Sequence, residues 1–116
     1  MDVLKLIKSF GYALVGICTS LKEQNMRIHL FSAVIVVIAG VLTGISITEW
    51  FVLIITIALV IGSEMINTAI EAVVNLASPE YHPLAKQAKD VAAGAVLVFA
   101  VASVIIGLLI FLPKWF

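Results

Sequence analysis

Three stretches of the sequence are long and apolar enough to cross a lipid bilayer, and no other feature limits the possible folds as strongly. About 20 helical residues, at roughly 1.5 Å each, span the hydrocarbon core. The stretches run over about 28–47, 50–77 and 84–112, and the last carries no charge from Val91 onward. Lipid offers no partners to open backbone N–H and C=O groups, so each stretch is predicted to be a transmembrane helix.

The composition supports an all-α membrane protein. Hydrophobic residues make up 63% of the chain and charged residues 12%, whereas soluble domains carry about 25% charged residues. The formal net charge is zero, so nothing in the total charge indicates nucleic-acid binding, and no nucleic-acid partner is expected. Cys18 is the single cysteine, which excludes an intrachain disulfide.

Residues 2–22 are predicted to form an amphipathic helix lying in the membrane interface. Apolar side chains recur there every three or four residues, at Val3, Ile7, Phe10, Leu14, Ile17 and Leu21. The charged side chains fall elsewhere on the helical wheel, as in interfacial helices. No removable signal peptide is expected, because no cleavage site follows an unbroken apolar block. The chain is therefore interpreted as a single integral-membrane domain over residues 1–116.

Local signals mark the breaks between the predicted transmembrane helices. Ser46 and Glu49 have the spacing of a capping box, and Trp50 suits the membrane interface, so a tight turn is predicted between the first two helices. Pro79 ends the second helix, and Pro83 suits the first turn of the third.

The basic residues predict the orientation of the chain. Six of the seven fall before the first transmembrane helix or between the second and third, at Lys5, Lys8, Lys22, Arg27, Lys86 and Lys89. Only Lys114 lies on the opposite side. Positive loops stay in the cytoplasm, so the N-terminus and the second loop are predicted to face the cytoplasm from the inner (plasma) membrane.

The second predicted helix carries polar residues where lipid-facing residues would be apolar. Glu64, Asn67 and Glu71 are three and four residues apart, which puts their side chains on one face, and Asn75 extends that face. Counted from Trp50, Glu64 lies roughly 21 Å deep and Glu71 roughly 31 Å deep. A carboxylate at the depth of Glu64 costs several kcal/mol unless it is paired, protonated or bound to a cation, so it indicates function.

These residue types match the needs of phosphoryl transfer. That reaction needs Mg²⁺, oxygen ligands for the metal, positive charge on the phosphates and a group that orients or deprotonates the acceptor. The candidates are Glu71, Asn67 and Glu23 as oxygen ligands, Lys89 and Arg27 as cations, and Glu64 as the base. Neither a Walker motif nor a kinase glycine-rich loop is present, so membrane helices would have to build any ATP site.

Two other classes of protein explain part of this pattern. In a small oligomeric ion or proton transporter, Glu64 would be the ion site. In a purely structural membrane subunit, a protonated Glu64 would hydrogen-bond a neighbouring helix. His29, beside Arg27, is interpreted as an interfacial polar anchor rather than as a ligand.

Over nearly its whole length, the chain resembles the small prokaryotic integral-membrane kinases that include diacylglycerol kinase and undecaprenol kinase. The most specific stretch is Glu64–Glu71, which reads Glu-Met-Ile-Asn-Thr-Ala-Ile-Glu. Tyr81 and His82 follow it, and then the run Ala88–Asp90 and residues 92–97.

The resemblance implies a role for particular residues. Glu64 would be the catalytic base and would contact the lipid substrate together with Asn67, while Glu23 and Glu71 would hold Mg²⁺ with support from Asn67. The implied nucleotide-binding residues are Lys5, Tyr12, Glu23, Glu71, Asn75, Tyr81, His82, Lys89 and Asp90. ATP is the implied co-substrate. The family also implies a homotrimer with active sites shared between protomers.

The chain departs from the family pattern at two of these positions. Asn75 stands where the family usually has aspartate, and Lys5 stands where the diacylglycerol branch has arginine. A lysine cannot make the bidentate phosphate contact of an arginine.

The expected function is ATP-dependent phosphorylation of a membrane lipid alcohol at the cytoplasmic face. Residues 23–29 and 110–114 resemble the Gram-positive undecaprenol branch, which favours undecaprenol as the substrate. Diacylglycerol is the alternative, because both lipids present a primary hydroxyl.

Overall fold

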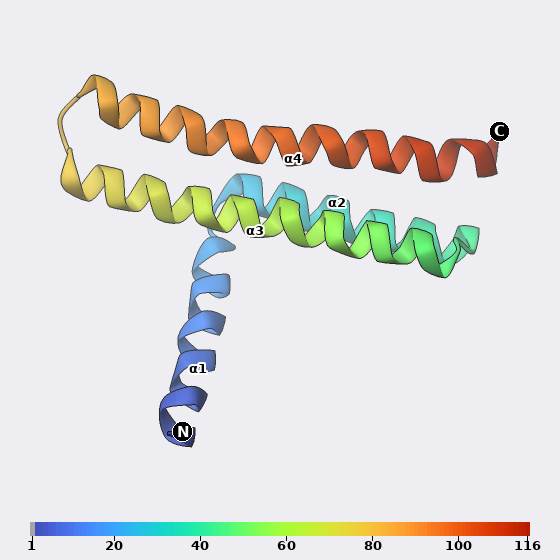
Figure 1. The fold of residues 1–116 in the computed structure, drawn as a ribbon, viewed down its shortest axis with the longest axis horizontal. Helices are drawn as coiled ribbons and strands as arrows, with labels where there is room; N and C mark the ends of the chain where they lie inside the picture. Colours follow the sequence, from blue (N-terminus) through green and yellow to red (C-terminus); the bar gives the residue numbers. More distant parts are fainter. Residues whose placement is uncertain (1) are drawn as a thin grey trace.

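The computed structural model describes residues 2–116, and these form four helices. They are α1 (Val3–Ser20), α2 (Gln24–Thr43), α3 (Ile47–Ala77) and α4 (Pro83–Trp115). Helices α2, α3 and α4 run side by side and change direction at each connection, whereas α1 leaves the bundle at a steep angle (Figure 1). The chain is therefore a three-helix bundle with one helix set across it.

The helix ends follow from capping residues in the sequence. Asp2 caps α1 by accepting a hydrogen bond from the backbone N–H of Lys5. The predicted capping box is confirmed, since the Ser46 side chain accepts from the Glu49 backbone and the Glu49 side chain accepts from the Ser46 backbone. Helix α2 ends at Thr43, before the predicted limit at 47, because its C-cap Gly44 has a left-handed φ of 74°, which favours glycine.

The helices extend beyond several of the predicted limits. Helix α2 begins four residues before the predicted start at 28, because its first turn is polar and only its later turns are apolar. Helix α3 begins at Ile47 instead of Trp50, directly after the Ser46 cap. Helix α4 has Pro83 in its first turn, as predicted, and continues past 112 through Pro113 to Trp115.

Helix α3 is the centre of the bundle and packs against both α2 and α4, which touch each other far less. A small apolar core of Ile45, Leu53, Ile110 and Phe111 lies near the α2–α3 turn. Two polar contacts tie the end of α4 to this region. Lys114 Nζ lies 2.5 Å from a Glu49 carboxylate oxygen, and Trp115 Nε1 donates to Thr43 Oγ1 over 3.0 Å.

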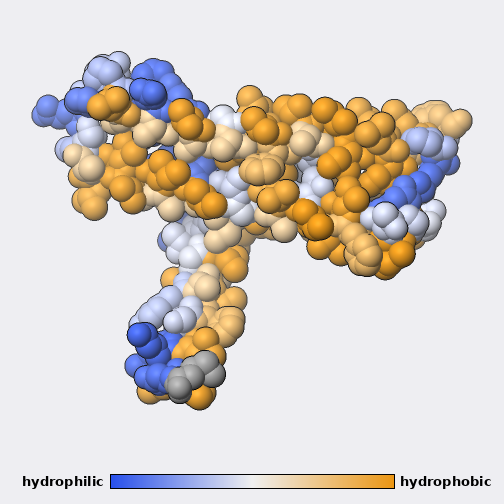
Figure 2. Space-filling model, in the orientation of Figure 1, coloured by the Kyte–Doolittle hydropathy of each residue, from blue (hydrophilic) through white to orange (hydrophobic). Residues whose placement is uncertain are grey.

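Most apolar side chains of the bundle point outward, so its long sides form an apolar surface with polar residues gathered towards the ends (Figure 2). All four helices are long and apolar enough to cross a membrane, α1 included. Exposed apolar surface of this extent suits a lipid environment and not water. The chain is thus an all-helical membrane protein.

Candidate active site

Two polar side chains are buried in the middle of α3. Glu64 keeps 3% of its surface exposed and Asn67 keeps 5%. They lie one turn apart on the helix face predicted from their spacing. Burying a carboxylate is costly unless other groups compensate, so the neighbours of Glu64 decide what this site can do.

His29 of α2 is one of these neighbours and comes from another helix. Its Nε2 lies 3.6 Å from Glu64 Oε2, and its side chain is four-fifths buried. The interpretation of His29 as an interfacial polar anchor did not include this contact with the buried carboxylate. Spacing along one helix cannot reveal a pair formed between two helices. The available signal was an ionisable residue inside an apolar segment, which usually has a partner.

The polar face continues from Glu64 towards the end of α3. Asn67 Nδ2 donates to Glu71 Oε1 over 3.3 Å. Asn67 Oδ1 is buried and has no hydrogen-bond partner. Glu23, at the start of α2, and Glu71 both lie close enough to Glu64 for their charges to interact with it. The structure thus brings Glu23, Glu64, Asn67 and Glu71 into one region.

Besides Glu64, this region offers oxygen ligands that suit Mg²⁺, namely the carboxylates of Glu23 and Glu71 and the unpartnered amide oxygen of Asn67. Within residues 2–116, no three acidic, histidine or cysteine side chains form a ready-made metal cluster. Magnesium in phosphoryl-transfer sites commonly takes one or two carboxylates and fills its remaining positions with water and phosphate oxygens. The residues present therefore fit this metal.

A second polar site lies at the connection between α3 and α4. A pocket of about 360 Å³ is lined there by four of the predicted nucleotide-binding residues, Asn75, Tyr81, His82 and Lys89. His82 also caps α4, with its Nδ1 accepting from the Leu84 backbone over 3.1 Å.

Asp90 does not line this pocket. It forms an exposed ion pair with Lys86, at 2.5 Å. Asn75, which lines the pocket, lies one turn after Glu71 on α3. The pocket therefore continues the polar face of the buried region.

Lys5 and Tyr12, the remaining predicted nucleotide-binding residues, lie on α1. Both side chains are exposed, and the helix that carries them points away from the bundle (Figure 1). Within one chain the structure therefore separates these two residues from Glu64 and from the α3–α4 pocket.

Fold and site together define a polytopic helical membrane protein with a buried carboxylate centre and a polar pocket beside it. Residues 11–111 match the model of the prokaryotic diacylglycerol kinase family, and the chain belongs to that family. It is accordingly a lipid kinase, and its kinase relatives imply ATP as the phosphate donor.

Individual relatives cover most of the chain. It is 50% identical over 114 residues to the undecaprenol kinase of Bacillus subtilis, and the aligned residues cover 97% of this chain and 93% of that protein. It is 46% identical over 110 residues to the diacylglycerol kinase of a Synechocystis strain, covering 93% of this chain and 63% of that protein. With the diacylglycerol kinase of Escherichia coli K12 the identity is 31% over 102 residues, covering 87% and 84%.

Proposed function

We propose that this kinase transfers the terminal phosphate of ATP to undecaprenol at the cytoplasmic face of the plasma membrane. The observation that carries this substrate is the 50% identity, over 97% of the chain, to a relative named undecaprenol kinase. Diacylglycerol remains the second candidate, because a relative named diacylglycerol kinase is 46% identical. Family membership favours a kinase over the ion-transport alternative.

Glu64 is proposed as the catalytic base. Its carboxylate takes the proton of the lipid hydroxyl while that oxygen bonds to the γ-phosphorus, and the bond from the γ-phosphorus to the β-phosphate oxygen breaks to release ADP. Its burial supports this role, since water is largely kept from the carboxylate. His29, 3.6 Å away, holds the carboxylate in place, and Asn67 helps position the acceptor.

Glu23, Glu71 and Asn67 are proposed to hold Mg²⁺. When bound there, the ion would neutralise charge on the phosphate oxygens. The unpartnered Asn67 Oδ1 supports this assignment, because a buried acceptor without a partner costs about 1–3 kcal/mol.

The pocket between α3 and α4 is proposed to hold the nucleotide. Lys89 supplies positive charge to the phosphates, and Tyr81 and His82 lie against the base. Asn75 lines the same pocket and donates or accepts hydrogen bonds there, while Asp90 acts at its edge.

A homotrimer with shared active sites is proposed to complete the nucleotide site. In one chain α1 carries Lys5 and Tyr12 away from the pocket, and three thin helices enclose little of a nucleotide. The α1 helix of a neighbouring protomer would bring Lys5 and Tyr12 to the phosphates. Each chain acts as a single domain in this assembly.

The proposed placement in the membrane follows from the arrangement of the helices. Helices α2, α3 and α4 span the bilayer, and α1 lies in the cytoplasmic interface with its apolar face in lipid. The steep angle between α1 and the bundle supports this, since a helix set across spanning helices runs along the membrane (Figure 1). The distribution of basic residues supports a cytoplasmic position for the N-terminus and the α3–α4 connection.

The substrate is tested by competition. Purified protein in lipid vesicles receives γ-labelled ATP and Mg²⁺ with undecaprenol and diacylglycerol at equal concentration. We expect label mainly in undecaprenyl phosphate, and none after the metal is removed with EDTA. Preferred labelling of phosphatidic acid would overturn the proposed substrate and leave the lipid kinase. Transfer that survives metal removal would contradict the magnesium assignment.

A further inference from the structure

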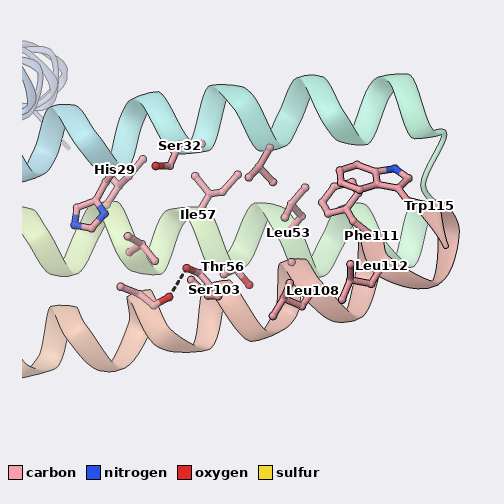
Figure 3. A pocket seen from close by; sticks show the side chains of 17 residues that line it. His29, Ser32, Leu53, Thr56, Ile57, Ser103, Leu108, Phe111, Leu112 and Trp115 are labelled. Carbon is pink, nitrogen blue, oxygen red and sulfur yellow. Dashed lines mark hydrogen bonds between the residues drawn. The ribbon is translucent and has the colours of Figure 1, made fainter.

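A long groove opens between α2, α3 and α4, on the outer side of the catalytic region. It has a volume of about 480 Å³. His29 lies at one end of it and Trp115 at the other, and Leu53, Ile57 and Leu108 lie between them (Figure 3). His29 also faces Glu64. The groove therefore starts beside the proposed catalytic base, at the histidine that contacts it.

The lining of the groove offers almost nothing polar to a ligand. Thr56 and Ser103 line it, but each hydroxyl donates to the backbone of its own helix, to Val52 over 2.7 Å and to Ala100 over 2.6 Å. Ser32, one turn after His29 on α2, adds a hydroxyl at the same end of the groove, and beyond these two residues the groove presents an apolar surface. Its polar end and apolar body match the polar head and apolar tail of a lipid alcohol.

Contacts between the helices bound the groove at the end opposite His29. The Trp115 indole donates to Thr43 of α2, and its ring packs on Phe111 with the ring centroids 5.1 Å apart. Lys114 pairs with Glu49 beside them. These contacts hold the end of α4 against the α2–α3 turn.

The length of the groove suits an extended lipid chain. From Ala100 to Trp115 it extends for fifteen residues of α4, or roughly 22 Å. The groove also opens along its side, so a tail can enter it from the surrounding lipid while the hydroxyl stays near His29.

We propose that this groove binds the first isoprenoid units of the lipid substrate and selects for a long, single-chain tail. The proposal rests on the proposed function and adds the location and length of the tail site. Four carbon–carbon bonds of about 1.5 Å give each extended isoprenoid unit a length near 5 Å, so roughly four units fill the groove. Diacylglycerol has two chains that diverge at its glycerol, and the groove accommodates one.

Gly107 of α4 allows a direct test. It lines the groove, and a Cβ added there meets no atom within 4 Å, so a larger side chain enters the groove without a clash. It lies seven residues beyond Ala100, or roughly 10 Å along the helix. A phenylalanine at position 107 would block the groove after about two isoprenoid units.

The experiment measures kcat/KM for undecaprenol, geranylgeraniol and the two-unit alcohol geraniol in vesicles. In Gly107→Phe, the ratio of undecaprenol to geraniol should fall by about tenfold or more, since burying two methylenes alone is worth about that factor. Ala102→Phe is the matched control, because Ala102 is exposed on the same helix and does not line the groove. Its ratio should equal that of the wild type. Val36→Phe blocks the groove from α2 at a similar depth, seven residues or roughly 10 Å beyond His29, and replaces Gly107→Phe if that variant fails to fold.

The outcomes distinguish the proposed substrate, undecaprenol, from the proposed tail site in the groove. Wild-type protein that phosphorylates only diacylglycerol would overturn the proposed substrate before any variant is made. Wild-type protein with equal kcat/KM for the three prenols, or groove variants with an unchanged ratio, would overturn the tail site alone. An unchanged ratio together with loss of crosslinked oligomers in Gly107→Phe would instead show that a second copy occupies the groove.

Discussion

At the scale of single residues, the burial of Glu64 explains most of the site. A carboxylate this deep in an apolar helix is unfavourable by several kcal/mol unless its environment compensates. His29 Nε2 lies 3.6 Å from the carboxylate, and Asn67 and Glu71 continue the polar face. The three α3 residues could be predicted from their spacing, because one helix fixes their common face. The histidine could not, because the sequence does not state which residues of α2 and α3 face each other.

Replacing His29 tests its positioning role. In His29→Phe the Glu64 carboxylate loses its partner, so we expect kcat to fall by roughly tenfold or more, with an unchanged KM for ATP. His29→Gln keeps an N–H donor and should recover part of the loss, which a purely structural role would not produce. Steady-state kinetics in vesicles measure both variants. Equal kcat values for His29→Phe and the wild type would remove His29 from the site.

At the scale of the helices, capping residues and the length of apolar segments predict most helix boundaries. Helix turns made of polar residues are not predicted by these signals. Ser46, Glu49 and Pro83 have the positions expected of them. The start of α2 was missed because its first turn is polar, and apolarity detects only the part of a helix that enters lipid. Apolar length alone would also count α1 as a spanning helix, whereas its angle to the bundle separates it from the others (Figure 1).

The α2–α3 hairpin depends on a close contact at Gly40. A Cβ added there would lie 2.8 Å from Trp50 Cη2 and 3.2 Å from Ile45 Cδ1, and the indole ring cannot yield easily. We expect Gly40→Ala to lower the free energy of unfolding by about 1–3 kcal/mol. Denaturant unfolding in detergent measures this effect. At Gly62 an added Cβ meets nothing within 4 Å, so Gly62→Ala should not destabilise the protein, and equal midpoints for the two variants would contradict the contact.

At the scale of the whole molecule, the proposed site is divided between the bundle and a helix that leaves it. Glu64 and the α3–α4 pocket belong to the bundle, while Lys5 and Tyr12 lie on α1. A single sequence could predict which residues carry the chemistry. It could not predict this separation, because the angle between α1 and the bundle depends on the turn at 21–23 and on its surroundings.

Mixing two defective chains tests the shared site. Glu64→Gln lacks the base, and the double variant Lys5→Gln, Tyr12→Ala lacks the α1 contribution. If α1 of one protomer serves the bundle of its neighbour, randomly mixed oligomers should recover roughly a quarter of the wild-type activity, since both halves are intact at one site in four. Co-reconstituted protein at a one-to-one ratio provides the measurement. Activity equal to the mean of the two variants measured separately would place each site within one chain.

The most direct test of the account measures ATP binding and phosphate transfer on the same Glu64→Gln protein. If Glu64 is the base, transfer to undecaprenol should fall by at least about a hundredfold, while ATP with Mg²⁺ binds as it does to the wild type. Glu49→Gln, at the other end of α3, serves as the control and should keep its turnover. Wild-type turnover in Glu64→Gln would contradict the catalytic role of the buried carboxylate, and loss of ATP binding would show that Glu64 belongs to the nucleotide site instead.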